Sequence, residues 1–318
     1  MRCVAILLII SLITSCGINR QQGETIHRVN PDDSFPDRVI LSKLKVTSAI
    51  QYHHWLDRLD PVDLGSLESA DILFRNCAAD TLSRDSMLFI YQEFRNHLAE
   101  IYFENNVQAN HQLENFPSPE TVNSLKAMFA GRGMLLSSSE GSFYLNPQIR
   151  YLSQNFGPGI SCACREYLAI ETREQEALFS REGRILISAD SLSSRILKWE
   201  EFIQQNPGFI SIRLAKEKYA YYLGAFLAGT DNSRAFDQEN NHLNDSLKIA
   251  FESFAEKNPD SKSTRVVKAY LQMLSLNDFN YSEKVDSFLL DKVYGTEIAG
   301  EQKDQPGQSP IQREQSFP

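Results

Sequence analysis

Apolar residues recur at helical spacing along most of the chain. Between Ser83 and Glu104 they fall at steps of three and four residues, which places one apolar stripe on a single helical face. The stripe consists of Met87, Tyr91, Phe94, Leu98 and Ile101. The pattern predicts a long amphipathic helix over this segment.

Two shorter helices are predicted before it. One runs from Leu64 to Cys77, after Pro61, and an earlier one starts near Pro36. The earlier helix closes with an apolar group made of Tyr52, Trp55, Leu56 and Leu59. Because short connections favour antiparallel neighbours, we expect residues 36–130 to form a small helical bundle.

The pattern changes in the centre of the chain, over residues 131–189. Turn residues separate two short apolar runs between Gly131 and Pro147, which predicts a small β-hairpin. A helix is expected from about Ser161 to Phe179, with a polar face rich in Arg and Glu. The segment Arg184–Ser188 is short enough to be a strand, and the hairpin is its candidate partner.

The C-terminal half contains an internal duplication at an offset of 52 residues. The segment from Trp199 to Phe209 matches the segment from Phe251 to Ser261, and Asn-Pro follows the aromatic pair in both copies. Proline ends the first helix of each copy, because it has no backbone N–H and restricts the residue before it. We expect residues 190–296 to form antiparallel helix pairs that bury their apolar faces by stacking.

These pairs resemble the tetratricopeptide-like repeats of bacterial envelope lipoproteins, in which two aromatic residues precede the turn between helices. The matching residues are Trp199, Phe202, Asn206 and Pro207 in the first copy and Phe251, Phe254, Asn258, Pro259 and Ser261 in the second. The 52-residue period departs from the 34 residues of that repeat, as does the insertion at 229–237. More widely, the chain resembles uncharacterised bacterial secreted proteins. The resemblance implies a mainly α fold and supplies no activity.

The N-terminus resembles a bacterial lipoprotein signal peptide. An apolar run follows Arg2, and Ile13, Thr14 and Ser15 precede Cys16, as in the motif where the cysteine is acylated. The run is too short to span a bilayer and fits a cleavable signal over residues 1–15. The resemblance implies lipid attachment at Cys16 and anchoring at the outer membrane, facing the periplasm. A secretory signal without lipidation and a short buried helix are the alternatives.

The composition of the chain limits the kinds of partner that it is expected to bind. The formal net charge is −9, and no Lys/Arg cluster of five or more is present. Nucleic acid is therefore disfavoured, and we expect the partners to be the membrane, through the lipid anchor, and other envelope proteins. Residues 16–35 are expected to be a flexible tether. A last helix over 282–294 should cap the stack, before a disordered tail at 297–318.

Three cysteines remain in the body of the chain, namely Cys77, Cys162 and Cys164. An oxidising envelope permits a disulfide between Cys77 and either of the other two, which would leave one thiol free. A metal or redox site is a further alternative, although Cys-Ala-Cys lacks the usual spacing of zinc ligands. Buried free thiols are the prediction we adopt, because Cys77 follows Leu67 and Phe74 on one helical face.

The search for catalytic chemistry gives no complete motif. Ser42 and Lys45 match the Ser-x-x-Lys spacing of penicillin-recognising enzymes, but no Lys-Thr-Gly accompanies them. His53-His54 and His97, paired with Glu100, are expected on solvated helical faces rather than in a proton-transfer site. The oxygen-rich loop from Thr230 to Ser233 could hold Ca²⁺, yet turn formation explains it equally well. No metal or cofactor is predicted.

The remaining candidates for ligand contact are Tyr219, Tyr221 and Tyr222, which would stack on a sugar or grip a peptide if they faced outward. Core packing is their alternative role. The sequence thus predicts a non-catalytic protein-binding or assembly scaffold anchored at the cell envelope. A lipoprotein that binds a small ligand or glycan is one alternative, and a hydrolase built from scattered Glu, Asp and His is the other.

Overall fold

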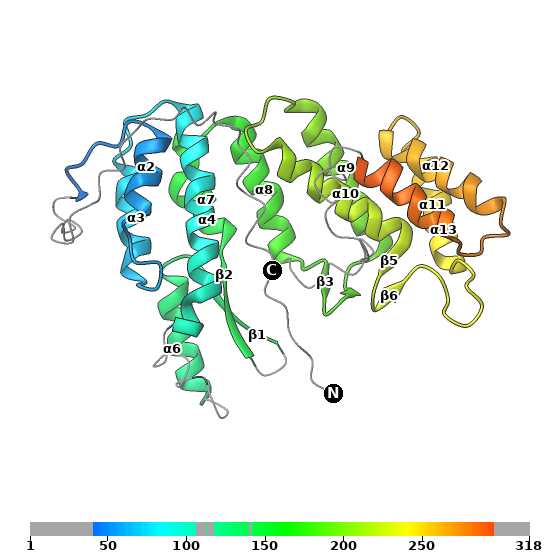
Figure 1. Ribbon diagram of the computed structural model, residues 1–318, viewed down its shortest axis with the longest axis horizontal. Helices are drawn as coiled ribbons and strands as arrows, with labels where there is room; N and C mark the ends of the chain where they lie inside the picture. The colour runs from blue at the N-terminus through cyan, green and yellow to red at the C-terminus, as the bar shows by residue number, and fades with distance from the viewer. Residues whose placement is uncertain (1–40, 106–112, 114–117, 140–141, 296–318) are drawn as a thin grey trace, which may run out of the picture.

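The computed structural model describes residues 41–105, 113, 118–139 and 142–295, and the statements below concern these residues. They form a mainly α-helical structure with small antiparallel hairpins, which confirms the predicted fold class. Figure 1 shows two groups of helices with α8 between them. We call the described part of 41–156 the N-terminal lobe and residues 189–294 the C-terminal lobe.

Four helices build most of the N-terminal lobe. They are α2 (Ala49–Leu56), α3 (Gly65–Arg75), α4 (Thr81–Asn105) and α6 (Pro119–Ala130). The predicted stripe on α4 is confirmed, because Met87, Tyr91 and Leu98 are fully buried. The same helix also buries Arg95, which lies off the stripe, so α4 is enclosed on more than one side.

The prediction of one helix from Pro36 to Leu59 is wrong over the described residues. Val46 forms a parallel β-bridge with Cys77, and its carbonyl accepts the backbone N–H of Ala78. Ser48 then starts α2 by accepting the N–H of Gln51 on its side chain, at 3.2 Å. An extended pairing and a new N-cap therefore delay the helix. Pro36 itself lies outside the described residues.

The predicted central hairpin is confirmed as β1 (Met134–Ser139) paired with β2 (Ser142–Pro147). Its strands pack on α4 and α6, so this small sheet leans on helices, as a two-stranded hairpin must. Helix α7 (Ile149–Phe156) and the short 3-10 turn Gly157–Gly159 follow it and lead to α8 (Cys162–Glu176). Ser161 caps α8, as the expected start of this helix requires.

The strand expected at Arg184–Ser188 does not pair with the central hairpin. Instead, β3 (Ser180–Arg181) and β4 (Arg184–Ile185) form a hairpin of their own. The turn between them places Glu182 and Gly183 at positive φ, which closes the chain back on itself within two residues. Its tip contacts a second small hairpin, β5 (Gly229–Thr230) and β6 (Ser233–Arg234), where Thr230 and Asn232 donate to the carbonyl of Gly183.

The duplicated segments fold as two equivalent helix pairs. The first is α9 (Ala189–Gln205) with α10 (Ile212–Ala228), and the second is α11 (Asp245–Lys257) with α12 (Lys262–Ser275). The first helices end 52 residues apart on Asn206 and Asn258, whose φ and ψ angles agree within 4°. Each asparagine side chain also donates to the carbonyl of its aromatic residue four positions earlier, at 3.1 and 2.9 Å.

Trp199 and Phe251, which head the two copies, occupy matching environments. Both are fully buried, and each contacts an aromatic ring of the preceding helix. Trp199 lies 5.6 Å from Tyr167 of α8, and Phe251 lies 5.0 Å from Phe226 of α10, measured between ring centroids. The duplication is therefore present in the packing of the helices as well as in the amino-acid sequence.

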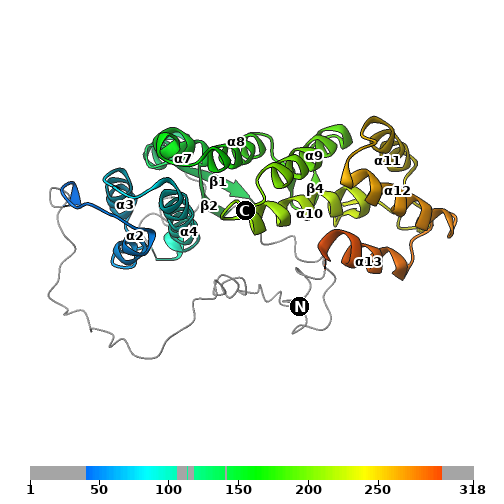
Figure 2. The ribbon, with the colours of Figure 1, turned by 90° about the horizontal axis from the view of Figure 1, so that it is seen from above.

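A last helix covers the C-terminal lobe. Helix α13 (Glu283–Leu289) continues into a π-helical turn, Leu290–Tyr294, which matches the expected span of 282–294. Figure 2 shows α13 on the side of α10 and α12 that faces away from α9 and α11. Phe288 contacts Tyr270 of α12, and Tyr294 packs closely over Gly224 of α10.

Candidate functional site

Two surface hollows lie in the N-terminal lobe, and residues of the connection between α2 and α3 line both. One of them lies between α2 and α4, and we call it the α2–α4 groove. It has a volume of about 300 Å³. Its apolar lining consists of Leu56, Leu59, Pro61, Ile90 and Phe94, and its titratable lining of His53, Asp57, Glu93 and His97.

Helical spacing explains why these four titratable residues share one groove. His53 of α2 and Asp57, the C-cap of that helix, lie four residues apart, and Glu93 and His97 lie four apart on α4. Residues at this spacing occupy one helical face, so each helix presents an acid and an imidazole together. Packing of α2 against α4 then brings the two pairs into the same hollow.

The charged groups of the groove are accessible carboxylates, which lie at the rim of an apolar floor. His53 Nδ1 lies 3.0 Å from Asp57 Oδ2. Desolvation by the surrounding groove raises the pKa of Glu93, and the nearby His53 acts in the opposite direction. Within the described residues, no Lys or Arg forms an ion pair with Glu93. The groove thus combines an acceptor-rich rim with apolar contact surface.

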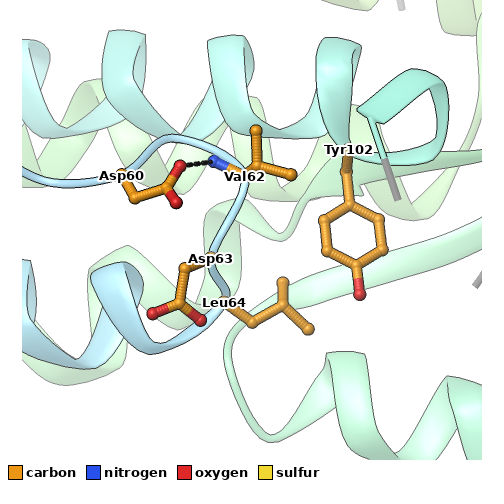
Figure 3. A pocket seen from close by; sticks show the side chains of 5 residues that line it. All are labelled: Asp60, Val62, Asp63, Leu64 and Tyr102. Carbon is orange, nitrogen blue, oxygen red and sulfur yellow. Dashed lines mark hydrogen bonds between the residues drawn. The ribbon is translucent and has the colours of Figure 1, made fainter. Parts of the chain in front are cut away.

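The second hollow, also of about 300 Å³, is lined by Asp60, Val62, Asp63, Leu64 and Tyr102. Figure 3 shows Tyr102 of α4 beside Leu64, and Asp60 accepting the backbone N–H of Val62. Asp63 in turn accepts the N–H of Gly65 at the start of α3. Both carboxylates therefore stabilise the turn that leads into α3, and turn formation explains their presence.

A buried polar cluster lies in the core of the N-terminal lobe. Asp71 of α3 accepts hydrogen bonds from the hydroxyls of Tyr91 and Tyr151, and burial raises the pKa of its carboxyl. The fully buried Arg95 guanidinium stacks on the same two rings and donates to the carbonyl of Gly133. This cluster was not predicted from the sequence, because a single polar residue beside an apolar stripe has no periodic pattern that distinguishes it from a residue on a solvated face.

Two of the three predicted ligand-contacting tyrosines use their hydroxyls inside the molecule. Tyr222 is buried and donates to Glu174 at 2.7 Å, and Tyr219 is half-buried, with its hydroxyl 3.0 Å from Ser263 Oγ. Trp199 donates to Glu174 as well, and burial raises the pKa of this carboxyl. Tyr221 is half-buried against the ring of Phe179. These contacts favour core packing for Tyr222, whereas ligand contact by Tyr219 and Tyr221 stays a prediction.

The cysteines of the body are free thiols. Their predicted burial is confirmed for Cys77 and Cys164 and wrong for Cys162, which is exposed. Cys77 lies 3.3 Å from the sulfur of Met87 and follows the end of α3 rather than lying on the helix. Burial raises the pKa of the Cys164 thiol, with Asp85 acting in the same direction. Neither predicted disulfide partner of Cys77 is bonded to it.

The other residues predicted as candidate catalytic or metal-binding groups lie in different parts of the structure. Ser42 and Lys45 lie before α2, whereas Thr230 and Asn232 bond the β3–β4 turn, which confirms their turn role. Cys16, the predicted lipid attachment site, lies outside the described residues. Over 41–105, 118–139 and 142–295, no cluster of three or more His, Cys, Asp or Glu side chains has a geometry suited to a metal ion. None of the helices in these ranges is long and apolar enough to cross a membrane.

Comparisons with protein-family models, curated proteins and solved structures found no match.

Proposed function

We propose that this chain is a lipid-anchored protein of the bacterial envelope that binds another envelope protein and acts as a non-catalytic scaffold. The observation that carries the proposal is the equivalence of the two helix pairs, α9–α10 and α11–α12. Stacked pairs of this kind form extended surfaces that serve in binding. Their aromatic residues fill the interior, which leaves the outer faces that α13 does not cover for contact with a partner.

Anchoring rests on the motif that ends at Cys16. Each buried CH₂ group of an acyl chain contributes about 0.8 kcal/mol to membrane binding, so a single chain binds only weakly. A bacterial lipoprotein carries two or three chains on its cysteine, which together hold the protein at the membrane. The tether expected at 16–35 would separate the lobes from the bilayer surface.

The buried carboxylates support a structural role over a catalytic one. Asp71 and Glu174 have raised pKa values, a property also found in catalytic acids. Each is at most 8 % exposed and accepts hydrogen bonds from two aromatic side chains of the core. A substrate could not reach either group without opening the packed core around it.

The anchoring half is tested by cell fractionation of the full chain and its Cys16→Ala variant. The wild-type chain should sediment with membranes, and the variant should appear in the soluble fraction. Equal sedimentation of the two would contradict lipid anchoring. Cys162→Ala is the matched control, because it removes an exposed cysteine outside the motif and should leave sedimentation unchanged.

The binding half is tested by crosslinking in intact cells followed by mass spectrometry. We expect one or more envelope proteins to be crosslinked to the two lobes of the wild-type chain. Crosslinks confined to abundant proteins, at the same level in a control lipoprotein of similar size, would count against a specific partner.

A further inference from the structure

The α2–α4 groove combines an apolar floor with four titratable side chains. Two acid–imidazole pairs face it from two helices, while the buried side chains of Leu56 and Leu59 contribute to its floor. We propose that the groove binds the cationic side chain of a lysine or arginine that a partner protein presents. The inference rests on the proposed function and names the chemistry that the partner offers.

The apolar floor fits the stem of such a side chain. Lysine and arginine carry three or four methylene groups, which pack on apolar surface while the charged head stays at the polar rim. Ile90 and Phe94 extend the floor along α4 toward Glu93 and His97. A volume of about 300 Å³ lies at the lower limit for small-molecule sites, and it suits one inserted side chain.

The charges on the rim select a cation. Glu93 is exposed at the groove, where desolvation raises the pKa of its carboxyl, and among the described residues no Lys or Arg pairs with it, so a bound cation would favour its ionised form. Asp57 contributes a second carboxylate, which His53 already orients. The chain as a whole carries a net charge of −9, which favours the approach of a basic partner.

The neighbouring hollow provides an internal contrast. Its carboxylates, Asp60 and Asp63, are also exposed, but each accepts a backbone N–H of the turn before α3. A cation there would compete with hydrogen bonds that the turn needs. In the α2–α4 groove Asp57 contacts a side chain, His53, rather than a backbone N–H of a turn, and no Lys or Arg of the described residues pairs with Glu93, so a cation there would compete with no turn hydrogen bond.

The test is an NMR titration of the full chain with N-acetyl-lysine methylamide, in the presence of a chelator that removes metal ions. The matched probe is N-acetyl-norleucine methylamide, which has the same apolar stem without the ammonium group. The imidazole resonances of His53 and His97 report on the groove, and those of His242 report on a distant surface. We expect the lysine probe alone to shift the two groove resonances.

Variants assign the binding to the carboxylates. Glu93→Gln keeps the shape of the side chain and should weaken the lysine probe about tenfold, as should Asp57→Asn. Glu104→Gln is the control, because Glu104 is exposed on the same helix and does not line the groove. Thermal unfolding midpoints close to that of the wild type would show that the variants fold.

Three results would overturn the inference. They are equal binding of the norleucine probe, lysine binding that Glu93→Gln and Asp57→Asn leave unchanged, and no binding of the lysine probe at all. The titration needs neither membrane nor partner. If crosslinking captures a specific partner and the lysine probe fails, the proposed function stands without this site. If the probe binds and no partner is captured, the groove binds cations and the proposed function fails.

Discussion

Glu200 shows how one residue can join two helix pairs. It lies on α9, and its carboxylate accepts the backbone N–H groups of Lys262 and Ser263 at the start of α12, at 2.7 and 2.9 Å. The hydroxyl of Ser261 donates to it at 2.8 Å, and that of Ser263 donates as well. Burial acts to raise the pKa of Glu200, but the hydrogen bonds from Ser263 and its neighbours outweigh it and lower the pKa. The ionised carboxylate thus caps a helix that follows it by about 60 residues.

We predict that Glu200→Gln destabilises the protein in a pH-dependent way. A carboxyl whose pKa is lower in the folded state stabilises that state above its unfolded pKa, and this contribution is lost as pH falls through the folded pKa. At pH 7 the variant should lose about 1.5–3 kcal/mol in free energy of unfolding, the range for hydrogen bonds to a charged group. The difference from wild type should shrink below about pH 4, near the ordinary Glu pKa. Urea unfolding at several pH values measures both quantities.

Glu201→Gln is the matched control, because Glu201 is the next residue and is exposed. Its carboxylate pairs with Lys198 at the surface, where an ion pair contributes little to stability. A difference between wild type and Glu200→Gln that stays constant from pH 7 to pH 3 would show that the charge of Glu200 is not what stabilises the contact.

For individual residues, the sequence predicted the burial of apolar side chains better than the burial of polar ones. Met87, Tyr91 and Leu98 are buried as their spacing indicates. Asp71 and Arg95 are buried too, yet nothing in their spacing distinguishes them from charged residues on a solvated face. Both contact Tyr91 and Tyr151, and the contacts of Asp71 with the two tyrosines and of Arg95 with Tyr151 join different helices, so they form only when the helices pack.

Among the elements, the step from α6 into β1 depends on Gly133. Its φ is +68°, in the left-handed region where a side chain is strained. A Cβ at this position would lie 2.3 Å from the ring of Tyr151. The carbonyl of the same residue accepts a hydrogen bond from Arg95, so the backbone here cannot move without disturbing the buried cluster.

We predict that Gly133→Ala destabilises the N-terminal lobe strongly. Positive φ alone costs alanine about 1 kcal/mol, and a steric clash in a packed core adds about 1–3 kcal/mol. Gly131→Ala, two residues earlier, is the control, because its φ of −60° suits alanine and a Cβ there meets only atoms at 3.7 Å. Thermal unfolding should show a much lower midpoint for Gly133→Ala alone. Similar midpoints for the two variants would mean that Tyr151 moves aside freely.

Helix existence and type could be predicted from the sequence, whereas several boundaries could not. The Asn-Pro pairs marked the ends of α9 and α11 correctly, because proline acts locally. The start of α2 failed, since the bridge between Val46 and Cys77 is a contact between distant residues. The strand at Arg184 pairs with the adjacent strand because Glu182 and Gly183 both adopt positive φ. Of these two residues, only the glycine indicates positive φ in the sequence.

In the whole molecule, the residues that line the α2–α4 groove could be picked out in the sequence, but their position in one shared groove could not be predicted. The spacings His53-x-x-x-Asp57 and Glu93-x-x-x-His97 are visible in the chain, and each places an acid and an imidazole on one helical face. Both histidines are exposed, as expected. Their shared hollow follows from the packing of α2 against α4, which depends on the connection between them and on the core beneath.

An aromatic cluster joins the two lobes. Phe209 lies in the turn between α9 and α10, and its ring centroid is 5.8 Å from Phe89 of α4 and 5.2 Å from Tyr167 of α8. It also contacts Phe202 of its own helix pair, at 5.1 Å. A hydrogen bond from the N–H of Ser161 to Asp85 ties the start of α8 to α4 beside this cluster. Because one side chain touches both lobes and the helix between them, its packing should couple their unfolding.

We predict that Phe209→Ala separates the unfolding of the lobes. Truncating a buried phenylalanine costs about 3–5 kcal/mol, and here the lost contacts are those that cross between lobes. Hydrogen exchange measured by mass spectrometry should show α4 and α12 of the wild type opening together in the slowest events, and opening at different free energies in the variant. Ile210→Ala is the matched control, because Ile210 is adjacent and 49 % exposed, and it should change neither lobe. If α4 and α12 keep equal opening free energies in Phe209→Ala, the lobes are coupled through α8 and the Ser161–Asp85 contact instead, and the aromatic cluster only adds stability.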